Sequence, residues 1–231
     1  MEKILSVEDD VELSKIIRLM LQNKGYEVVS ALSVKEAMEA MDKNSFDLIL
    51  LDMMLSDGEG TQLCEEIRNK SFCPIIFVSC ISDKETKLKA LEIGGDDYIT
   101  KPIDFNDLFM RIQVNIRRAN QYNLGKSFSL EEKIGDLIIK KQKHEVWAVA
   151  QEDTMIMLSP LEYGLLMCFI DNQDELLLYS DLYKSVWNAD DAGDFRTVMV
   201  HVSNLRKKLK DKGIDYIHTV RSAGYIFSVK Y

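Results

Sequence analysis

The chain has 231 residues and a formal net charge of −9, and 46% of its residues are hydrophobic and 29% charged. This length suffices for two domains with separate cores, and the composition excludes disordered and fibrous proteins. No apolar run approaches the roughly 18 residues of a membrane span, and the first residues turn acidic where a signal peptide stays apolar, so we expect a cytoplasmic protein.

The first 120 residues alternate β-branched runs with stretches of helical period. Strands are predicted at residues 4–7, 26–31, 46–51, 74–79 and 97–100, and apolar residues recur at i, i+3 and i+4 after each of them. The middle strands are apolar on both faces, as a parallel sheet covered by helices on both sides requires. The pattern predicts a doubly wound α/β domain with a five-stranded parallel sheet over residues 1–120.

Residues 119–131 lose this periodicity and gain polar and small side chains, so we place a linker at 121–131. The second domain, 132–231, opens with predicted antiparallel strands at 136–139, 145–149 and 155–158. Ser159 is then expected to cap a helix, with Pro160 at its first position and Glu162 completing a capping box. Helices near 179–187 and 195–209 and a terminal hairpin of strands 216–220 and 225–229 complete an α+β domain.

Polar side chains follow four of the predicted parallel strands. Glu8 and Asp9 follow the first, Asp52 the third, Ser79 the fourth and Lys101 the fifth. Ligands collect beyond the carboxyl ends of such strands, and converging carboxylates favour a hard cation such as Mg²⁺. A carboxylate nucleophile, a metal, a lysine and a hydroxyl together suit phosphoryl transfer.

The sequence does not match two other phosphate-handling motifs. Gly125-Lys126-Ser127 is similar to the end of a P-loop, but Asn120 stands where that motif needs its first glycine. A phosphatase of the haloacid dehalogenase type needs a second acid two residues after its nucleophile, and Met54 occupies that position after Asp52.

Four segments carry a family resemblance: Val7 to Asp10, Leu50 to Leu55, Val78-Ser79 and Asp96 to Pro102. Over residues 1–120 the chain resembles the receiver domain of bacterial two-component response regulators. The resemblance implies that Asp52 accepts a phosphoryl group from a partner histidine kinase and that Lys101 and Ser79 contact it. It implies that Mg²⁺ is held by Asp9, Asp52, the backbone carbonyl of Met54 and, through water, Glu8. The Lys101–Pro102 peptide is expected to be cis.

The same resemblance implies a switch in which Ser79 moves toward the phosphoryl group, Tyr98 turns inward and a dimer forms. The expected dimer contacts pair Lys87 with Asp107 and Asp97 with Arg111. Departures from the family pattern remove none of the phosphorylation residues. They are Ser56 in place of proline, Cys80 and Gly95 in place of alanine, and Ile103 in place of an aromatic residue.

The end of the chain is basic, with eight basic and two acidic side chains in residues 195–231. The helix at 195–209 has one apolar stripe: Val198, Val202, Leu205 and Leu209. We expect the opposite face to present Arg196, Val200, Ser203, Asn204 and Lys207, with Thr197 and Lys208 at its side. Adding Arg206 and the hairpin residue Arg221, we predict a helix in the DNA major groove and an arginine in the minor groove.

This half of the chain resembles the winged-helix effector domain of the OmpR/PhoB family, through Leu158 to Tyr163, Val186-Trp187, Arg196 to Leu209 and Thr219 to Tyr225. The resemblance implies a four-stranded sheet, a three-helix core and a wing, with His201 in a structural or backbone-contacting role. It implies a transcription factor, not an enzyme, whose phosphorylated homodimer binds direct-repeat promoter DNA and RNA polymerase.

Two other functions remain open. Cys80, beside Ser79, suggests a thiol-sensing regulator, and the receiver could act as a protein-binding module without DNA output. The four cysteines are Cys64, Cys73, Cys80 and Cys168. They lack CxxC spacing and a nearby histidine, so we expect reduced thiols and no zinc site or disulfide framework.

Overall fold

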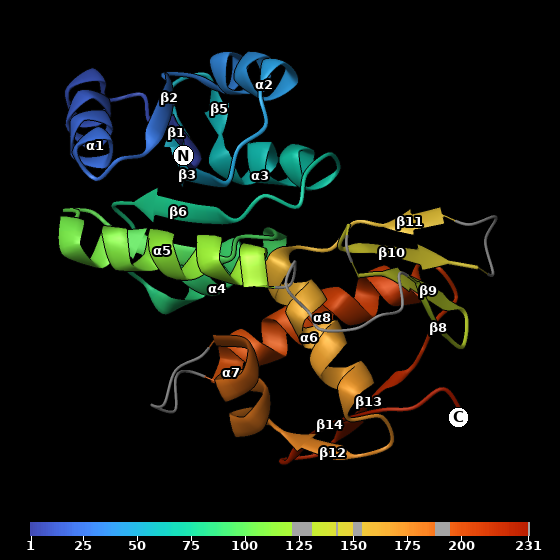
Figure 1. Ribbon diagram of the computed structural model, residues 1–231. Coiled ribbons are helices and arrows are strands. Elements are labelled where there is room, and N and C mark those ends of the chain that lie inside the picture. The colour runs from blue at the N-terminus through green and yellow to red at the C-terminus, as the bar shows by residue number, and fades with distance from the viewer. Residues whose placement is uncertain (122–130, 142, 150–153, 188–194, 231) are drawn as a thin grey trace. The chain divides into compact units, whose positions relative to one another are not determined.

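A computed structural model describes residues 1–121, 131–141, 143–149, 154–187 and 195–230 (Figure 1). The chain divides into two compact units, Met1–Ala119 and Asn120–Tyr231, and each is described by itself. Most of the predicted linker, residues 122–130, lies outside the described residues.

The first unit is built on a parallel sheet of five strands in the order β2-β1-β3-β6-β7. The strands are β1 (Lys3–Val7), β2 (Glu27–Ala31), β3 (Leu48–Asp52), β6 (Ile75–Ser79) and β7 (Asp97–Thr100). The five predicted strands are confirmed, with ends shifted by two residues or fewer. Strand order reverses between β1 and β3, so the crevice beyond their carboxyl ends is where this fold binds ligands.

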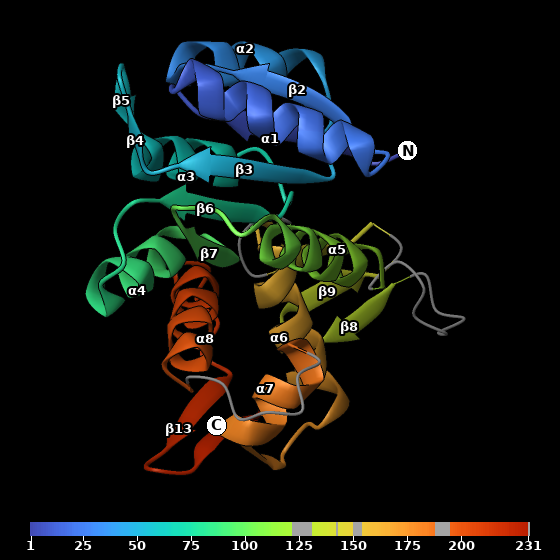
Figure 2. The ribbon, with the colours of Figure 1, turned by 90° about the vertical axis from the view of Figure 1, so that its left-hand side faces the viewer.

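Helices cover both faces of this sheet, as Figure 2 shows for α1, α2 and α3. They are α1 (Val11–Asn23), α2 (Val34–Lys43), α3 (Gly60–Arg68), α4 (Lys84–Ile93) and α5 (Phe105–Gln121). Ile49 and Leu51 of β3 pack into the core with α2, α3 and α4, and Leu48 and Leu50 pack into the core with α1 and α5. All five residues of β3 and of β6 are buried, which confirms the doubly wound arrangement.

A short hairpin, which the sequence did not predict, follows β3. Its strands are β4 (Met54–Leu55) and β5 (Gly58–Glu59), paired antiparallel. Gly60 begins α3 directly after it, and a Cβ at this position would lie 1.9 Å from the backbone oxygen of Asp52. Only glycine allows the chain to return so close to the end of β3.

The second unit opens with an antiparallel sheet in the order β11-β10-β9-β8. The strands are β8 (Glu132–Ile134), β9 (Leu137–Lys140), β10 (Glu145–Ala148) and β11 (Thr154–Ile156). Three helices follow: α6 (Pro160–Asp171), α7 (Tyr179–Trp187) and α8 (Phe195–Lys210). Ser159 and Glu162 form the predicted capping box at the start of α6, with Pro160 at the first turn.

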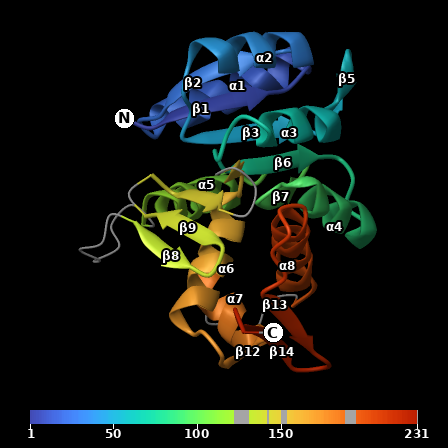
Figure 3. The same ribbon diagram turned by 90° about the vertical axis from the view of Figure 1, so that its right-hand side faces the viewer.

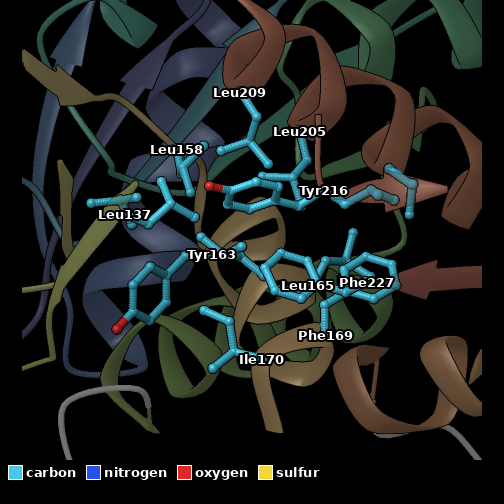
Figure 4. Packing of buried hydrophobic residues seen from close by; sticks show 14 of the residues in the cluster. Leu137, Leu158, Tyr163, Leu165, Phe169, Ile170, Leu205, Leu209, Tyr216 and Phe227 are labelled. Carbon is cyan, nitrogen blue, oxygen red and sulfur yellow. The ribbon is translucent and has the colours of Figure 1, made fainter. Parts of the chain in front are cut away.

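The chain ends in β13 (Ile217–Val220) and β14 (Gly224–Phe227), the predicted hairpin. The structure adds β12 (Leu176–Leu178), which pairs with β14 and makes a three-stranded sheet. Its three consecutive leucines give no alternation, so the sequence did not reveal this strand. Figure 4 shows Phe169 of α6, Leu205 of α8 and Phe227 of β14 in one core. This core fixes α8 between the other helices and the terminal hairpin.

Candidate functional site

Three carboxylates meet beyond the carboxyl ends of β1 and β3. Glu8, Asp9 and Asp52 each offer an oxygen, and these oxygens lie within 4.8 Å of one another. The side chains of Glu8 and Asp52 are nearly buried, with residue exposures of 1% and 6%. Hard oxygen donors held this closely fit Mg²⁺, whose charge would offset their mutual repulsion.

Lys101, which follows β7, lies against two of these carboxylates. Its Nζ is 2.5 Å from Oδ2 of Asp52 and 2.8 Å from Oε2 of Glu8. The Lys101–Pro102 peptide is cis, as expected. Three sequence-distant strand ends therefore place one ammonium between two carboxylates.

The buried charges shift the pKa values of this group. Burial raises the pKa of Glu8, and the charge of Asp52 raises it further, although the hydrogen bond from Lys101 opposes both effects. Burial alone would lower the pKa of Lys101, but hydrogen bonds to Asp52 and Glu8 outweigh it, and that pKa is raised. Lys101 therefore carries its positive charge at neutral pH.

The backbone after Asp52 also contacts its carboxylate. The Met54 N–H donates a hydrogen bond to Oδ1 of Asp52 at 3.0 Å. The Met54 side chain is exposed, so this residue would contribute to a metal site only through its backbone. The β4–β5 hairpin is thus in direct contact with the predicted phospho-acceptor.

Ser79 and Tyr98 are both buried near the end of the sheet. The hydroxyl of Ser79 accepts a hydrogen bond from the Ile81 N–H at 3.2 Å, and the hydroxyl of Tyr98 donates to the Ile81 carbonyl at 2.8 Å. The sequence led us to expect that Tyr98 turns inward on phosphorylation. In this structure it is already inward, with Lys87 Nζ 5.6 Å from the centre of its ring.

The residues expected at a dimer interface are paired within the chain. Arg111 of α5 contacts Asp97 at 2.7 Å and Asp107 at 2.9 Å. The pair of Arg111 with Asp97, which we expected between two chains, is thus formed within one chain in this structure. Lys87 contacts Tyr98 rather than Asp107. An interface between two chains would have to exchange or share these pairs.

The exposed face of α8 differs from the predicted one at one position. Arg196, Ser203 and Lys207 are exposed, and Thr197, Asn204, Arg206 and Lys208 are half-buried. The prediction that Val200 lies on the open face is wrong, because only 9% of this residue is exposed. Since α8 packs against both α6 and α7, its buried face is wider than the four-residue stripe. Met199, which the sequence analysis missed, is 39% exposed.

The β13–β14 hairpin and α8 are joined by a hydrogen bond. Nη1 of Arg206 donates to the hydroxyl of Thr219 in β13 at 3.0 Å. A shallow hollow of about 500 Å³ lies beside it, lined by Ser203, Arg206, Lys207, Lys210, Asp211 and Tyr225. Lys210 and Asp211 were not predicted for this surface because they follow the predicted end of the helix. The exposed Arg221 lies in the hairpin turn between β13 and β14.

His201 and Lys208 serve the core of the second unit. His201 is buried and its ring lies 5.6 Å from that of Trp187. Nζ of Lys208 is 2.6 Å from the buried carboxylate of Glu162, so it ties α8 to the start of α6. The structural role implied for His201 agrees with this position.

All four cysteines are free thiols: Cys64 and Cys73 are buried, Cys168 is half-buried and Cys80 is exposed. Within the described residues, no helix combines the length and apolarity needed to cross a membrane.

Comparison with known proteins agrees with both halves. Residues 4–113 match the family described as response regulator receiver domain, and residues 152–227 match transcriptional regulatory protein, C terminal. The response regulator ArlR of Staphylococcus saprophyticus is 36% identical over 98% of this chain and 99% of its own. The alkaline phosphatase synthesis regulator PhoP of Bacillus subtilis is 32% identical over 97% and 95%.

Among solved structures, a mutant of RitR has a TM-score of 0.83 and 28% identity, covering 98% of this chain and 99% of that one. The relatives are transcription regulators, and the match to a DNA-binding output domain disfavours a receiver without DNA output. A receiver fold, a winged-helix unit and full-length relatives agree: the chain belongs to the OmpR/PhoB family of two-component response regulators, which are DNA-binding transcription regulators.

Proposed function

We propose that phosphorylation of Asp52 by a sensor histidine kinase switches this protein to a dimer that binds promoter DNA. The observation that carries the proposal is the position of Lys101, whose Nζ contacts both Asp52 and Glu8 beside Asp9. Residues 1–120 would be the receiver, 121–131 the linker and 132–231 the effector domain.

In the transfer step, the P–N bond to the kinase histidine breaks as a P–O bond to an Asp52 oxygen forms, and the released imidazole takes up a proton. Asp9, Asp52, the Met54 carbonyl and, through water, Glu8 would hold Mg²⁺, whose charge would neutralise the carboxylates and the phosphoryl oxygens. Lys101 supplies a fixed positive charge 2.5 Å from Oδ2 of Asp52. Burial of Asp52 excludes much of the water that would compete with these contacts.

Ser79 and Tyr98 would couple this step to the dimer surface. Both reach Ile81, through its N–H and its carbonyl respectively, so movement of Ser79 toward the phosphoryl group would disturb the Tyr98 contact. Tyr98 lies under Lys87 and adjoins Asp97, and the latter pairs with Arg111. We propose that Lys87, Asp97, Asp107 and Arg111 re-pair across a homodimer interface.

The DNA-binding surface would consist of the exposed side of α8 and the turn between β13 and β14. Its proposed residues are Arg196, Thr197, Ser203, Asn204, Arg206, Lys207 and Arg221. Val200 is omitted because it is buried. Two such domains on direct-repeat sites would gain affinity through effective concentration, and RNA polymerase is the proposed further partner.

The test compares wild type with Asp52→Ala, each with and without a small phosphodonor and Mg²⁺. Oligomeric state is measured by analytical ultracentrifugation and DNA affinity by fluorescence anisotropy. We expect the phosphodonor to dimerise the wild type alone and to tighten its DNA binding. Equal dimerisation and binding by both proteins would refute the proposed switch.

A thiol-sensing function is the second candidate, because Cys80 is exposed directly beside Ser79. One solved relative, 28% identical with a TM-score of 0.50, is titled as a family of redox sensors in the streptococci that evolved from response regulators. The discriminating experiment measures DNA affinity of Asp52→Ala under reducing and oxidising conditions. A thiol-dependent change that Cys80→Ser abolishes would support this candidate.

A further inference from the structure

The β4–β5 hairpin is held by hydrogen bonds at two places, and one of them lies outside the carboxylate cluster. At its start, the Met54 N–H donates to Oδ1 of Asp52. At its turn, the Asp57 carboxylate reaches the N-terminus of α2: Oδ1 accepts from the Val34 N–H at 2.8 Å and Oδ2 from the Lys35 N–H at 3.3 Å. Figures 2 and 3 both show the hairpin rising beside α2.

These bonds supply acceptors for two backbone N–H groups in the first turn of α2. The first N–H groups of a helix lack partners within it, and they attract a negative charge. Ser33 takes the Glu36 N–H at 3.1 Å through its side chain and the Ala37 N–H at 3.0 Å through its carbonyl. Asp57 accepts from the N–H groups of Val34 and Lys35 from a different part of the chain, so its bonds are tertiary contacts.

The hairpin also packs closely on α2. A Cβ at Gly58 would lie 3.0 Å from Cγ2 of Val34, and Leu55 is buried in the core that includes Ala37 of α2. The Val34 hydrogen bond lowers the pKa of Asp57, so this carboxylate is ionised at neutral pH and matches the positive end of the helix.

We propose that Asp57 is a positioning residue for the phosphorylation site: by tying the hairpin to α2, it fixes the Met54 backbone against Asp52. This inference rests on the proposed function and adds to it a residue that does not touch the reacting atoms. The Met54 N–H orients one Asp52 oxygen, and the Met54 carbonyl is a proposed Mg²⁺ ligand. A loosened hairpin would therefore weaken metal binding and slow phosphoryl transfer together.

The chain offers a matched control in Ser33→Ala. This variant removes a cap of the same helix but leaves both fastenings of the hairpin intact. Asp57→Ala removes the link. Asp57→Asn retains one carbonyl acceptor, so its Mg²⁺ affinity should lie between those of Asp57→Ala and wild type. All variants are made in the full-length protein, and their midpoints of thermal unfolding are recorded.

The decisive measurement is Mg²⁺ affinity by isothermal titration calorimetry, followed by the rate of phosphorylation by phosphoramidate at saturating Mg²⁺. We expect Asp57→Ala to bind Mg²⁺ about 10-fold more weakly, the lower end of the effect of groups that support metal ligands. Ser33→Ala should bind Mg²⁺ like wild type despite a similar loss of thermal stability. Partial restoration by Asp57→Asn supports positioning.

Wild-type Mg²⁺ affinity in Asp57→Ala, with only a lower melting temperature, would overturn the inference and leave Asp57 as a helix cap. Equal weakening in Ser33→Ala would also overturn it, because the effect would then come from α2 stability. Failure of wild type to accept a phosphoryl group would refute the proposed function instead. The Mg²⁺ titration would still decide the role of Asp57 in that case.

Discussion

Arg68 and Asp96 form a buried ion pair that joins the end of α3 to the start of β7. Nη2 of Arg68 lies 2.5 Å from Oδ2 of Asp96, and their side chains are only 7% and 0% exposed. Arg68 also donates to the Gly94 and Cys73 carbonyls, and Asp96 accepts from the Ile75 N–H. One side chain pair therefore fastens α3 to the segments around β6 and β7.

Asp96→Ala should destabilise the receiver strongly, because it leaves a buried guanidinium without its counter-charge. Removing one partner of a buried pair costs about 3–5 kcal/mol. Asp42→Ala is the control, since Asp42 contacts Lys70 at 3.7 Å with both side chains largely exposed, and such pairs contribute at most about 1 kcal/mol. Urea unfolding, monitored by circular dichroism, measures the free energy of unfolding of both variants. Equal decreases in the two variants would contradict the structural role of the buried pair.

The parallel sheet could be predicted because each strand carries its own signal. The apolar runs at β3 and β6, and the polar residues that follow them, place Asp52 and Ser79 at one edge of the sheet without any knowledge of packing. The Lys101 contact with Glu8 depends on how β7 lies relative to β1, so its distance came only from the structure.

Other features could not be predicted from the sequence because they depend on tertiary contacts. Helical periodicity placed Val200 opposite the apolar stripe, but a helix packed against two others buries more than one stripe. The bonds from Asp57 to α2 span more than 20 residues and carry no local motif. The in-chain pairing of Arg111 with Asp107 fits i, i+4 spacing and could have been anticipated.

The pH dependence of α4 should follow Asp83, which caps this helix. Its carboxylate accepts from the Thr86 N–H at 2.8 Å, and this bond lowers its pKa. A carboxyl whose pKa is lower in the folded state than in the unfolded state stabilises the folded protein at pH values above its unfolded pKa. That stabilisation is lost as the pH falls through the folded pKa. The loss should therefore occur below about pH 4.

An NMR titration of the Thr86 amide tests this expectation. The amide should shift with an apparent pKa below the ordinary value of 3.8, and Asp83→Asn should remove the transition. A transition that persists in Asp83→Asn would assign the titration to another group.

The thiols should differ sharply in reactivity. Cys80 is exposed, whereas burial raises the pKa of Cys73 far above its ordinary value, and burial also raises that of Cys168. Because the thiolate is the reactive species, Cys80 should react rapidly with Ellman's reagent in the folded protein, the half-buried Cys168 more slowly, and the buried Cys64 and Cys73 only on unfolding. Cys80→Ser should remove the fast phase, and a fast phase that survives would show that another cysteine is accessible.

Two substitutions on the basic helix should separate charge from geometry in DNA binding. Lys207 is exposed, so Lys207→Ala should weaken binding to all DNA sequences and reduce the slope of log affinity against log salt by about one. Thr219→Val removes the hydroxyl that holds Arg206 but no charge, so affinity should fall with an unchanged slope. Fluorescence anisotropy across a salt series measures both, and the exposed Lys143, between β9 and β10 of the second unit, supplies the control Lys143→Ala. A slope change in Thr219→Val, or none in Lys207→Ala, would place the phosphate contacts elsewhere on the domain.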